Sequence, residues 1–126
     1  MKVARFVVSS ILVAAASMAH AFEIKPYSAQ ALADAEKAGQ PVALHFHADW
    51  CSTCRAQDKT LESMKGEKGL DLTILKVNYD TEKELKKRFN VRTQSTMVVL
   101  KDTKEVARLA GDTSADGIRG ALKAAL

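Results

Sequence analysis

Cysteine is scarce in this sequence of 126 residues: only two are present, which excludes a small fold held together by several disulfides. A strong charge of one sign is also absent. Lys and Arg number 19 against 15 Asp and Glu, and the formal net charge of +4 is too small to indicate a nucleic-acid-binding surface. The sequence shows no internal repeat, low-complexity segment or interdomain linker. Its length and its 47% of apolar residues are typical of one globular domain and exclude a multidomain enzyme.

The sequence also lacks an apolar run long enough to cross a membrane. The run Phe6–Ala19 is shorter than the about 20 residues of a spanning helix, which disfavours an uncleaved membrane anchor. Two basic residues precede this run, and the small residues Ala19 and Ala21 end it, which is the pattern of a secretory signal peptide. With no cysteine near the cleavage site, the pattern of a lipid-anchored protein is missing. We expect residues 1–21 to be removed and residues 22–126 to form an exported mature domain.

Apolar periodicity, helix caps and turn residues predict alternating helices and strands in the mature domain. Helices are expected at residues 28–38, 50–66, 81–89 and 114–125, and strands at 22–25, 42–46, 70–77, 96–100 and 105–109. For the first residues of 70–77, a loop is the alternative. Thr81 and Glu84 match a capping box at the start of the third helix. Residues 101–104 are expected to join the last two strands as a hairpin. Because a strand–helix–strand unit pairs in parallel and a hairpin does not, the predicted fold is α/β with a mixed sheet and helices on both faces.

The two cysteines, Cys51 and Cys54, are three residues apart where a predicted strand passes into a helix. A disulfide between them closes so short a loop that the chain-entropy model gives about 2 kcal/mol, against about 4.7 for a loop of 100 residues. As a structural cross-link the pair is therefore poorly placed. As a reagent it is well placed, because the first cysteine lies at a helix N-terminus, where free amides stabilise a thiolate. The thiolate is the nucleophile of thiol–disulfide exchange, and the second cysteine can resolve the mixed disulfide.

A metal site is the alternative interpretation of this pair. His45 and His47 lie two apart on the preceding strand, so their side chains share a face and bring the nitrogen and sulfur ligands to four. Zinc or copper bound by these histidines with Cys51 and Cys54 would make the protein a metal-binding module. With no second pair of cysteines present, redox exchange is the favoured prediction.

The segment Phe46–Cys54 resembles the active-site segment of the thioredoxin superfamily. Within it, Ala48–Cys51 is similar to the C-terminal, thioredoxin-like domain of the bacterial membrane reductase DsbD. Further matches to the family pattern lie at Lys76–Asp80, Val91–Arg92, Thr96–Lys101 and Gly111. This resemblance implies a thioredoxin fold and a periplasmic thiol–disulfide oxidoreductase that needs no organic cofactor.

The resemblance also implies roles for individual residues. Cys51 is expected to be the exposed attacking thiol and Cys54 the buried resolving thiol. Trp50 is expected to shape the docking surface, with plain core packing as the alternative. Lys76 is expected to lie beneath the site and tune the thiols, with an exposed strand lysine as the alternative. The backbone of Gln94 is expected to pair with the substrate peptide.

Two residues depart from the family pattern. Ser95 stands where the family usually has a cis-proline facing the cysteines, so we expect the Gln94–Ser95 bond to be either trans or strained. His45 stands where thioredoxin has a buried acid. Its imidazole is expected either to accept the proton of Cys54 or to be a core histidine bonded to a backbone carbonyl.

The expected partners are protein disulfides and a second thiol protein that resets the pair, with a membrane reductase as one candidate donor. The reducing direction is preferred on the resemblance, because oxidants of the DsbA type usually carry a helical insertion. A periplasmic thiol oxidant and a non-catalytic docking domain stay as alternatives. The low net charge favours a monomer.

Overall fold

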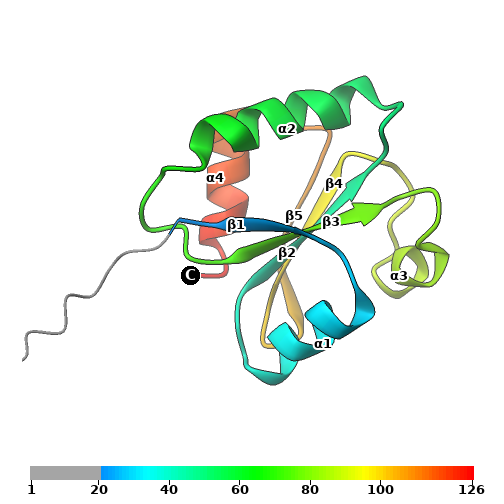
Figure 1. Ribbon diagram of the computed structural model, residues 1–126, viewed down its shortest axis with the longest axis vertical. Coiled ribbons are helices and arrows are strands. Elements are labelled where there is room, and N and C mark those ends of the chain that lie inside the picture. Colours follow the sequence, from blue (N-terminus) through cyan, green and yellow to red (C-terminus); the bar gives the residue numbers. More distant parts are fainter. Residues whose placement is uncertain (1–20) are drawn as a thin grey trace, which may run out of the picture.

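The computed structural model describes residues 21–126, which form one five-stranded sheet with helices packed against it (Figure 1). The elements in chain order are β1 (Glu23–Pro26), α1 (Ala29–Lys37), β2 (Val42–His47), α2 (Ser52–Met64), β3 (Thr73–Asn78), α3 (Lys83–Arg88), β4 (Thr96–Lys101), β5 (Lys104–Ala110) and α4 (Ala115–Lys123). The strand order is β1-β3-β2-β4-β5. The first three strands are parallel, and β4 and β5 each run antiparallel to their neighbour, so the predicted mixed sheet is confirmed.

Helices α2 and α4 cover one face of the sheet, and α1 and α3 lie on the other (Figure 1). The alternation of side chains along β2 explains this arrangement. Leu44 and Phe46 point into a core that includes Leu32 of α1 and Leu85 of α3. His45, which lies between them, and His47 point to the opposite face, toward α2. Strand β2 is buried on both faces and holds the segment that leads into the cysteines at the centre of the fold.

The predicted capping box at the start of α3 is wrong. The helix begins one residue later than expected, with Glu82 as its N-cap, and no side chain caps it. The chain approaches the helix through a turn in which the Glu82 amide donates to the Asn78 carbonyl and the Lys83 amide donates to the Thr81 carbonyl. These backbone bonds occupy the position that a Thr81 cap would need. The sequence also suggests Ser28 as the cap of the first helix, and there the Ser28 side chain accepts from the Ala31 amide. Ser114 caps α4 in the same way, by accepting from the Gly117 amide.

The hairpin between β4 and β5 is tighter than the sequence predicts. Both strands extend by one residue into the expected turn, which leaves Asp102 and Thr103 as the two-residue connection. Their φ angles are 49° and 68°, the left-handed pair that matches the twist of a two-residue hairpin. The loop alternative for the start of the third strand is confirmed, because residues 70–72 form a turn ahead of β3.

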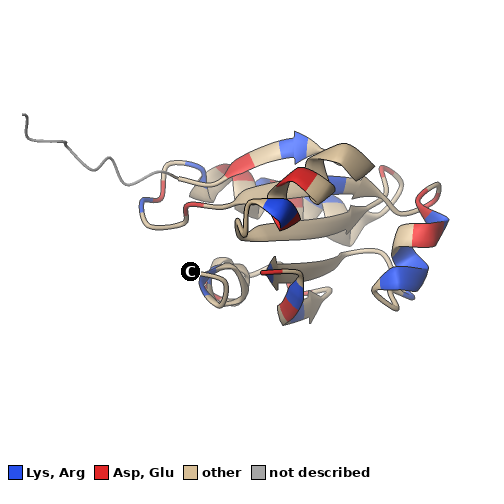
Figure 2. Cartoon of the chain, turned by 90° about the horizontal axis from the view of Figure 1, so that it is seen from below, with Lys and Arg blue, Asp and Glu red and all other residues tan. Residues whose placement is uncertain are grey.

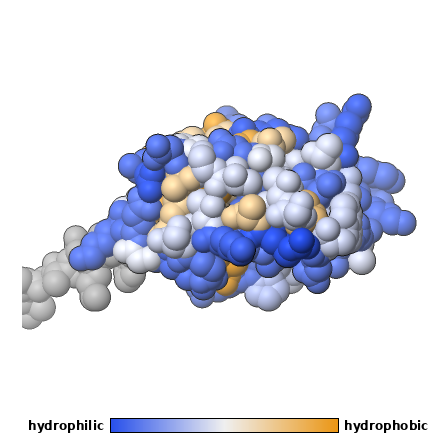
Figure 3. All heavy atoms as spheres, turned by 90° about the horizontal axis from the view of Figure 1, so that it is seen from above, coloured by the Kyte–Doolittle hydropathy of each residue, from blue (hydrophilic) through white to orange (hydrophobic). Residues whose placement is uncertain are grey.

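Charged residues of both signs lie on the helices, and α3 carries mainly basic ones (Figure 2). The face seen from above is mostly hydrophilic, with scattered apolar residues (Figure 3). In residues 21–126 no helix is both long enough and apolar enough to cross a membrane. The predicted signal peptide, apart from Ala21, lies outside the described residues.

Candidate active site

The two cysteines lie at the start of α2, directly after β2, at the carboxyl end of the parallel strands. Cys51 is the N-cap of α2, with extended φ and ψ angles of −91° and 112°. Its Sγ accepts a hydrogen bond of 3.2 Å from the Cys54 amide. This is the place that the sequence predicts for the first cysteine. Amides at a helix N-terminus stabilise a negative charge on the capping atom, and here that atom is sulfur.

Ser95, in the loop before β4, contacts both cysteines. Its Oγ lies 3.1 Å from Cys51 Sγ and 3.1 Å from Cys54 Sγ. The two sulfur atoms therefore lie against one hydroxyl group, and a short chain of polar hydrogens connects them. Cys51 and Cys54 lie at the start of α2, whereas Ser95 comes from the loop before β4.

The backbone of Ser95 is in an unusual conformation. The described residues contain no cis peptide bond, so Gln94–Ser95 is trans, and the φ angle of Ser95 is 63°. A non-glycine residue in this left-handed region stores about 1–3 kcal/mol of strain. Three hydrogen bonds hold it there. Its amide donates to the Phe46 carbonyl (2.9 Å), and its carbonyl accepts from the Gly111 amide (3.0 Å) and from Gln57 Nε2 (3.0 Å).

Both thiols are buried, which corrects the expectation that Cys51 is exposed. Cys51 is 4% exposed and Cys54 is fully buried. The Ser95 hydroxyl covers the Cys51 sulfur on one side, while Trp50 and Ser52, which flank Cys51 in the chain, are exposed. The reactive sulfur therefore lies just beneath the surface, beside an accessible rim.

The two thiols differ in acidity. Burial alone would raise the pKa of Cys51, but hydrogen bonds from the Cys54 thiol, the Ser95 hydroxyl and backbone amides outweigh it and lower that pKa below its ordinary value. Burial and the hydrogen bond to Cys51 raise the pKa of Cys54. The site thus favours one thiolate, at Cys51, and one thiol, at Cys54. This is the asymmetry that an attacking and a resolving cysteine require.

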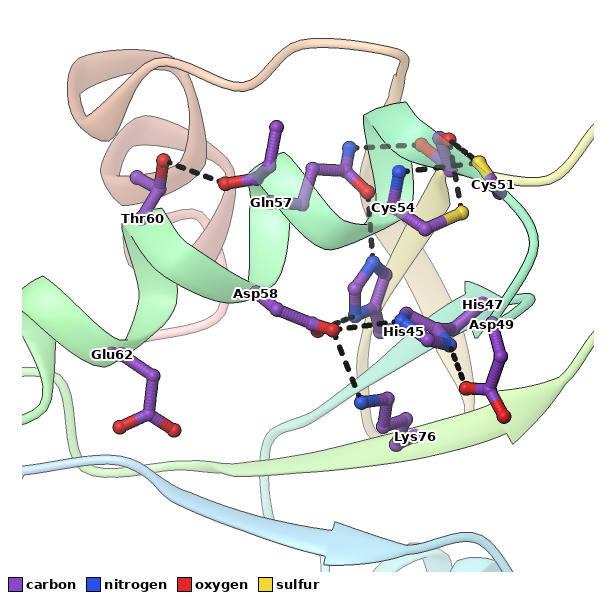
Figure 4. Close-up of polar contacts among 12 residues, drawn as sticks. His45, His47, Asp49, Cys51, Cys54, Gln57, Asp58, Thr60, Glu62 and Lys76 are labelled. Carbon is purple, nitrogen blue, oxygen red and sulfur yellow. Dashed lines mark hydrogen bonds and ion pairs between the residues drawn. The ribbon is translucent and has the colours of Figure 1, made fainter.

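His45 is a buried core histidine whose partner is the side chain of Gln57 and not a backbone carbonyl (Figure 4). Gln57 Nε2 donates to the carbonyls of Ser95 and Asp112, each at 3.0 Å. Gln57 Oε1 is therefore the acceptor of the 2.8 Å contact with His45 Nε2, which must carry a hydrogen. Burial lowers the pKa of His45 to about 4, so the ring is neutral at pH 7.

The second nitrogen of His45 also faces α2, because Nδ1 lies 4.0 Å from Asp58 Oδ1. Both ring nitrogens are thus directed to α2 side chains other than Cys54. The core-histidine expectation describes the position found. The expectation that His45 accepts the Cys54 proton finds no matching contact between these two described residues, and it stays a prediction.

Asp58 binds two side chains from the sheet (Figure 4). Its Oδ2 lies 2.7 Å from His47 Nε2 and 3.2 Å from Lys76 Nζ. Lys76 is beneath α2 on the neighbouring strand, as predicted, but its ammonium is directed at this carboxylate. Asp49 Oδ1, at 3.8 Å, faces the other nitrogen of His47.

These contacts bear on the metal-binding alternative. The histidines are directed at Asp58 and Gln57, while the cysteines are directed at Ser95. Within residues 21–126, no group of three or more His, Cys, Asp and Glu side chains is placed to hold a metal ion. The four ligands that the sequence brings close along the chain are therefore not gathered around one point.

Trp50 is on the surface beside the thiols, 61% exposed, so plain core packing is excluded. Its Nε1 donates a 2.8 Å hydrogen bond to Asp80 Oδ2. Trp50 lines a surface pocket of about 350 Å³ together with His47, Lys76, Asp80 and neighbouring residues. Gln94, half-buried, directly precedes Ser95 in the loop before β4.

Sequence reasoning missed Gln57 and Asp58. Both are on α2, three and four residues after Cys54, and that spacing places side chains on one face of a helix. The same spacing could have identified them as neighbours of the site. Asp80, the partner of Trp50, is distant in sequence and gave no such signal.

Comparison with known proteins agrees with this geometry. The family model described as thioredoxin matches residues 23–124. The chain belongs to the thioredoxin family. Thioredoxins are thiol–disulfide oxidoreductases, and this protein is therefore a thioredoxin-like redox protein with Cys51 and Cys54 as its cysteine pair.

Individual relatives place the chain within the thioredoxin family. A thioredoxin of Mycobacterium bovis is 33% identical over 88 residues, which cover 70% of this chain and 76% of that one. The crystal structure of Trxlp from Edwardsiella tarda has a TM-score of 0.73 at 34% identity and covers 79% of this chain and 98% of its own. A reduced thioredoxin pre-protein of Schistosoma mansoni has a TM-score of 0.68 at 18% identity, covering 84% and 99%, and shows the shared fold alone.

Proposed function

We propose that this protein is an exported, periplasmic thioredoxin that reduces or exchanges protein disulfides. The pairing of a thiolate-favouring Cys51 with a thiol-favouring Cys54 around Ser95 Oγ is the observation that carries the chemistry. The signal-like pattern of residues 1–21 supports export. The likeness of Ala48–Cys51 to the C-terminal domain of DsbD supports the periplasm and the reducing direction.

The reaction proceeds in two exchanges. The Cys51 thiolate attacks one sulfur of a substrate disulfide, forms a mixed disulfide and releases the other sulfur as a thiolate. The Cys54 thiol then loses its proton, and its sulfur attacks Cys51. The product is a Cys51–Cys54 disulfide, and the second substrate sulfur leaves as a thiol with that proton. Two electrons pass from the cysteine pair to the substrate.

The surface around the thiols is proposed to bind the substrate. Trp50 offers an exposed indole held by Asp80, and Gln94, next to Ser95 in the chain, offers its backbone groups. Lys76 and His45 lie beneath the site and are proposed to act through α2, where they contact Asp58 and Gln57.

A second thiol protein must return electrons to the pair, and a membrane reductase fits an exported protein. A relative of Mycobacterium leprae, 31% identical over 88 residues, is named a bifunctional thioredoxin reductase/thioredoxin, so a reductase and a thioredoxin occur there in one chain. For this protein we propose a separate donor and a monomeric state.

Measuring the equilibrium with glutathione tests the direction of electron flow. A reductant is expected to have a reduction potential well below about −180 mV. A value well above that figure would contradict the reducing role and favour the alternative of a thiol oxidant. Wild-type protein that carries stoichiometric zinc or copper and does not reduce a disulfide would favour the metal-binding alternative.

Export is tested separately by expressing the whole chain in a bacterium. The periplasmic fraction is expected to contain protein whose mass corresponds to a start at Phe22. A matched chain of residues 22–126, with an added initiator methionine, is the control and is expected to stay in the cytoplasm. Full-length protein of unchanged mass in the cytoplasm would overturn the proposed export.

A further inference from the structure

The Ser95 hydroxyl has two sulfur neighbours and only one hydrogen to donate. It lies 3.1 Å from each of Cys51 Sγ and Cys54 Sγ. A hydroxyl has one hydrogen to donate, so at any moment it can donate a hydrogen bond to only one of the two sulfurs. The direction of these two bonds therefore depends on which sulfur carries the negative charge.

We propose that Ser95 is a catalytic residue that directs its single hydrogen to whichever of the two cysteines is the thiolate. In the reduced protein, it donates to the Cys51 thiolate, while Cys54 keeps its own hydrogen as a thiol. After Cys51 has entered a mixed disulfide, it donates to the Cys54 thiolate as that thiolate forms. This inference rests on the dithiol exchange proposed above and assigns the hydroxyl a part in both of its steps.

The surrounding structure suits this role because the backbone of Ser95 is fixed while its hydroxyl hydrogen is free to rotate. Its amide donates to the Phe46 carbonyl, and its carbonyl accepts from Gly111 and Gln57. These bonds hold Ser95 at a φ angle of 63°. Since Oγ is equally distant from both sulfurs, rotation about the Cβ–Oγ bond alone redirects the hydrogen. No backbone movement is needed between the two steps.

Charge and proton are conserved along the cycle. In the first step, the Cys51–substrate S–S bond forms, the substrate S–S bond breaks, and the negative charge leaves with the first substrate sulfur. In the second step, the Cys54 proton passes to the second substrate sulfur, the Cys51–Cys54 bond forms, and the Cys51–substrate bond breaks. Ser95 keeps its own hydrogen throughout and stabilises each thiolate in turn.

Two substitutions separate the hydroxyl from the backbone strain. Ser95→Ala removes the hydroxyl and keeps a Cβ in the left-handed region, while Ser95→Gly removes the hydroxyl and relieves the strain. The two variants are expected to differ in stability, with the glycine variant the more stable. Both variants are expected to be slowed equally in the attack by Cys51 and in the resolution by Cys54. Thr93→Ala removes a hydroxyl from the same loop, which bonds Thr96, and is the matched control.

The experiment is a stopped-flow reaction of the reduced protein with the small chromogenic disulfide DTNB, which releases one thiolate at Cys51 attack and a second at resolution by Cys54. At pH 7 both phases are expected to be about tenfold slower in Ser95→Ala and Ser95→Gly than in wild type, and unchanged in Thr93→Ala. The pH midpoint of Cys51 alkylation, located by mass spectrometry, is expected to rise by about one unit in both serine variants.

Other outcomes are equally decisive. Wild-type rates in both serine variants would overturn the role of Ser95. Slow phases in Ser95→Ala with wild-type phases in Ser95→Gly would also overturn it, since backbone strain and not the hydroxyl would then control the rate. Wild-type protein that releases fewer than two thiolates would instead contradict the dithiol exchange itself, so the two failures are distinguishable.

Discussion

Gln57 Oε1 accepts a 2.8 Å hydrogen bond from His45 Nε2, and this contact joins the central strand β2 to the helix that carries the cysteines. The same amide group donates to the carbonyls of Ser95 and Asp112. The fully buried Gln57 side chain thus connects strand β2, the loop that carries Ser95 and the segment after β5. The tautomer of His45 and the position of Ser95 both depend on it.

The neutral state of His45 predicts a stability that depends on pH. Burial lowers its pKa to about 4 in the folded protein, against 6.5 in an unfolded chain. As pH falls, the unfolded chain takes up the proton first. The contribution of neutral His45 to the unfolding free energy is therefore complete above about pH 6.5 and is lost progressively toward pH 4. The shift corresponds to about 3 kcal/mol of unfolding free energy.

Denaturant unfolding of wild type and His45→Gln at pH 7 and pH 4 measures this effect. The variant keeps a donor for Gln57 but does not titrate, so its stability is expected to fall by about 3 kcal/mol less than that of wild type over this range. An NMR titration of the His45 ring is expected to have its midpoint near pH 4. A midpoint near 6.5 would show that the ring is not desolvated.

Gln57 itself is predicted to stabilise the fold. In Gln57→Ala, His45 Nε2 loses its partner in the interior and the carbonyls of Ser95 and Asp112 each lose one hydrogen bond, so the expected loss is about 3 kcal/mol in unfolding free energy, measured in urea. Gln30→Ala is the control, because Gln30 is exposed and bonds only Asp34. Its effect is expected to be within about 0.5 kcal/mol. Equal losses in the two variants would contradict the structural role of Gln57.

The sequence alone was sufficient to predict the order of the elements, the mixed sheet and the position of the cysteine pair at a helix N-terminus. These features depend on local patterns: apolar periodicity, the serine caps and the C-x-x-C spacing. The capping box at Thr81 failed because a turn anchored at Asn78 competes with it, and such a turn has no strong local signal.

The interior of the site was harder to predict, because its contacts join residues that are distant in the chain. Ser95 reaches Cys51 across 44 positions, and Trp50 reaches Asp80 across 30. The burial of Cys51 follows from the first of these contacts and could not be derived from the segment around the cysteines. The orientation of His45 and His47 likewise depends on α2 side chains that only the folded structure brings near them.

The difference in acidity between the thiols predicts which cysteine reacts first. The lowered pKa of Cys51 gives it a larger thiolate fraction than an ordinary cysteine, while the raised pKa of Cys54 keeps that residue protonated near neutral pH. Brief alkylation at pH 6–7, followed by peptide mass spectrometry, is expected to label Cys51 at least tenfold more than Cys54. Preferential labelling of Cys54 would reverse the assignment of attacking and resolving roles.

Variants of the two cysteines give an independent check. Cys54→Ser keeps the attacking thiol and is expected to trap a mixed disulfide with a protein substrate, visible on a non-reducing gel. Cys51→Ser is expected to trap none, because the remaining thiol is fully buried and protonated. Mixed disulfides of equal amount in both variants would contradict this order.

Trp50 is predicted to act in substrate binding and not in folding. Its side chain is exposed, so Trp50→Ala is expected to change the unfolding free energy by no more than about 0.5 kcal/mol. An aromatic side chain at the centre of a binding surface commonly supplies more than 1 kcal/mol of affinity. The KM for a protein disulfide such as insulin is therefore expected to rise about fivefold or more.

The rate with DTNB distinguishes binding from chemistry, because that small disulfide does not need an extended docking surface. It is expected to stay within about twofold of wild type in Trp50→Ala. Asp80→Asn, which keeps an acceptor for the indole, is expected to behave like wild type with both substrates. Val106→Ala removes an exposed apolar side chain on β5 and serves as the control. A tryptophan variant that slows insulin and DTNB equally would place Trp50 in the chemistry of the thiols and contradict a role in docking.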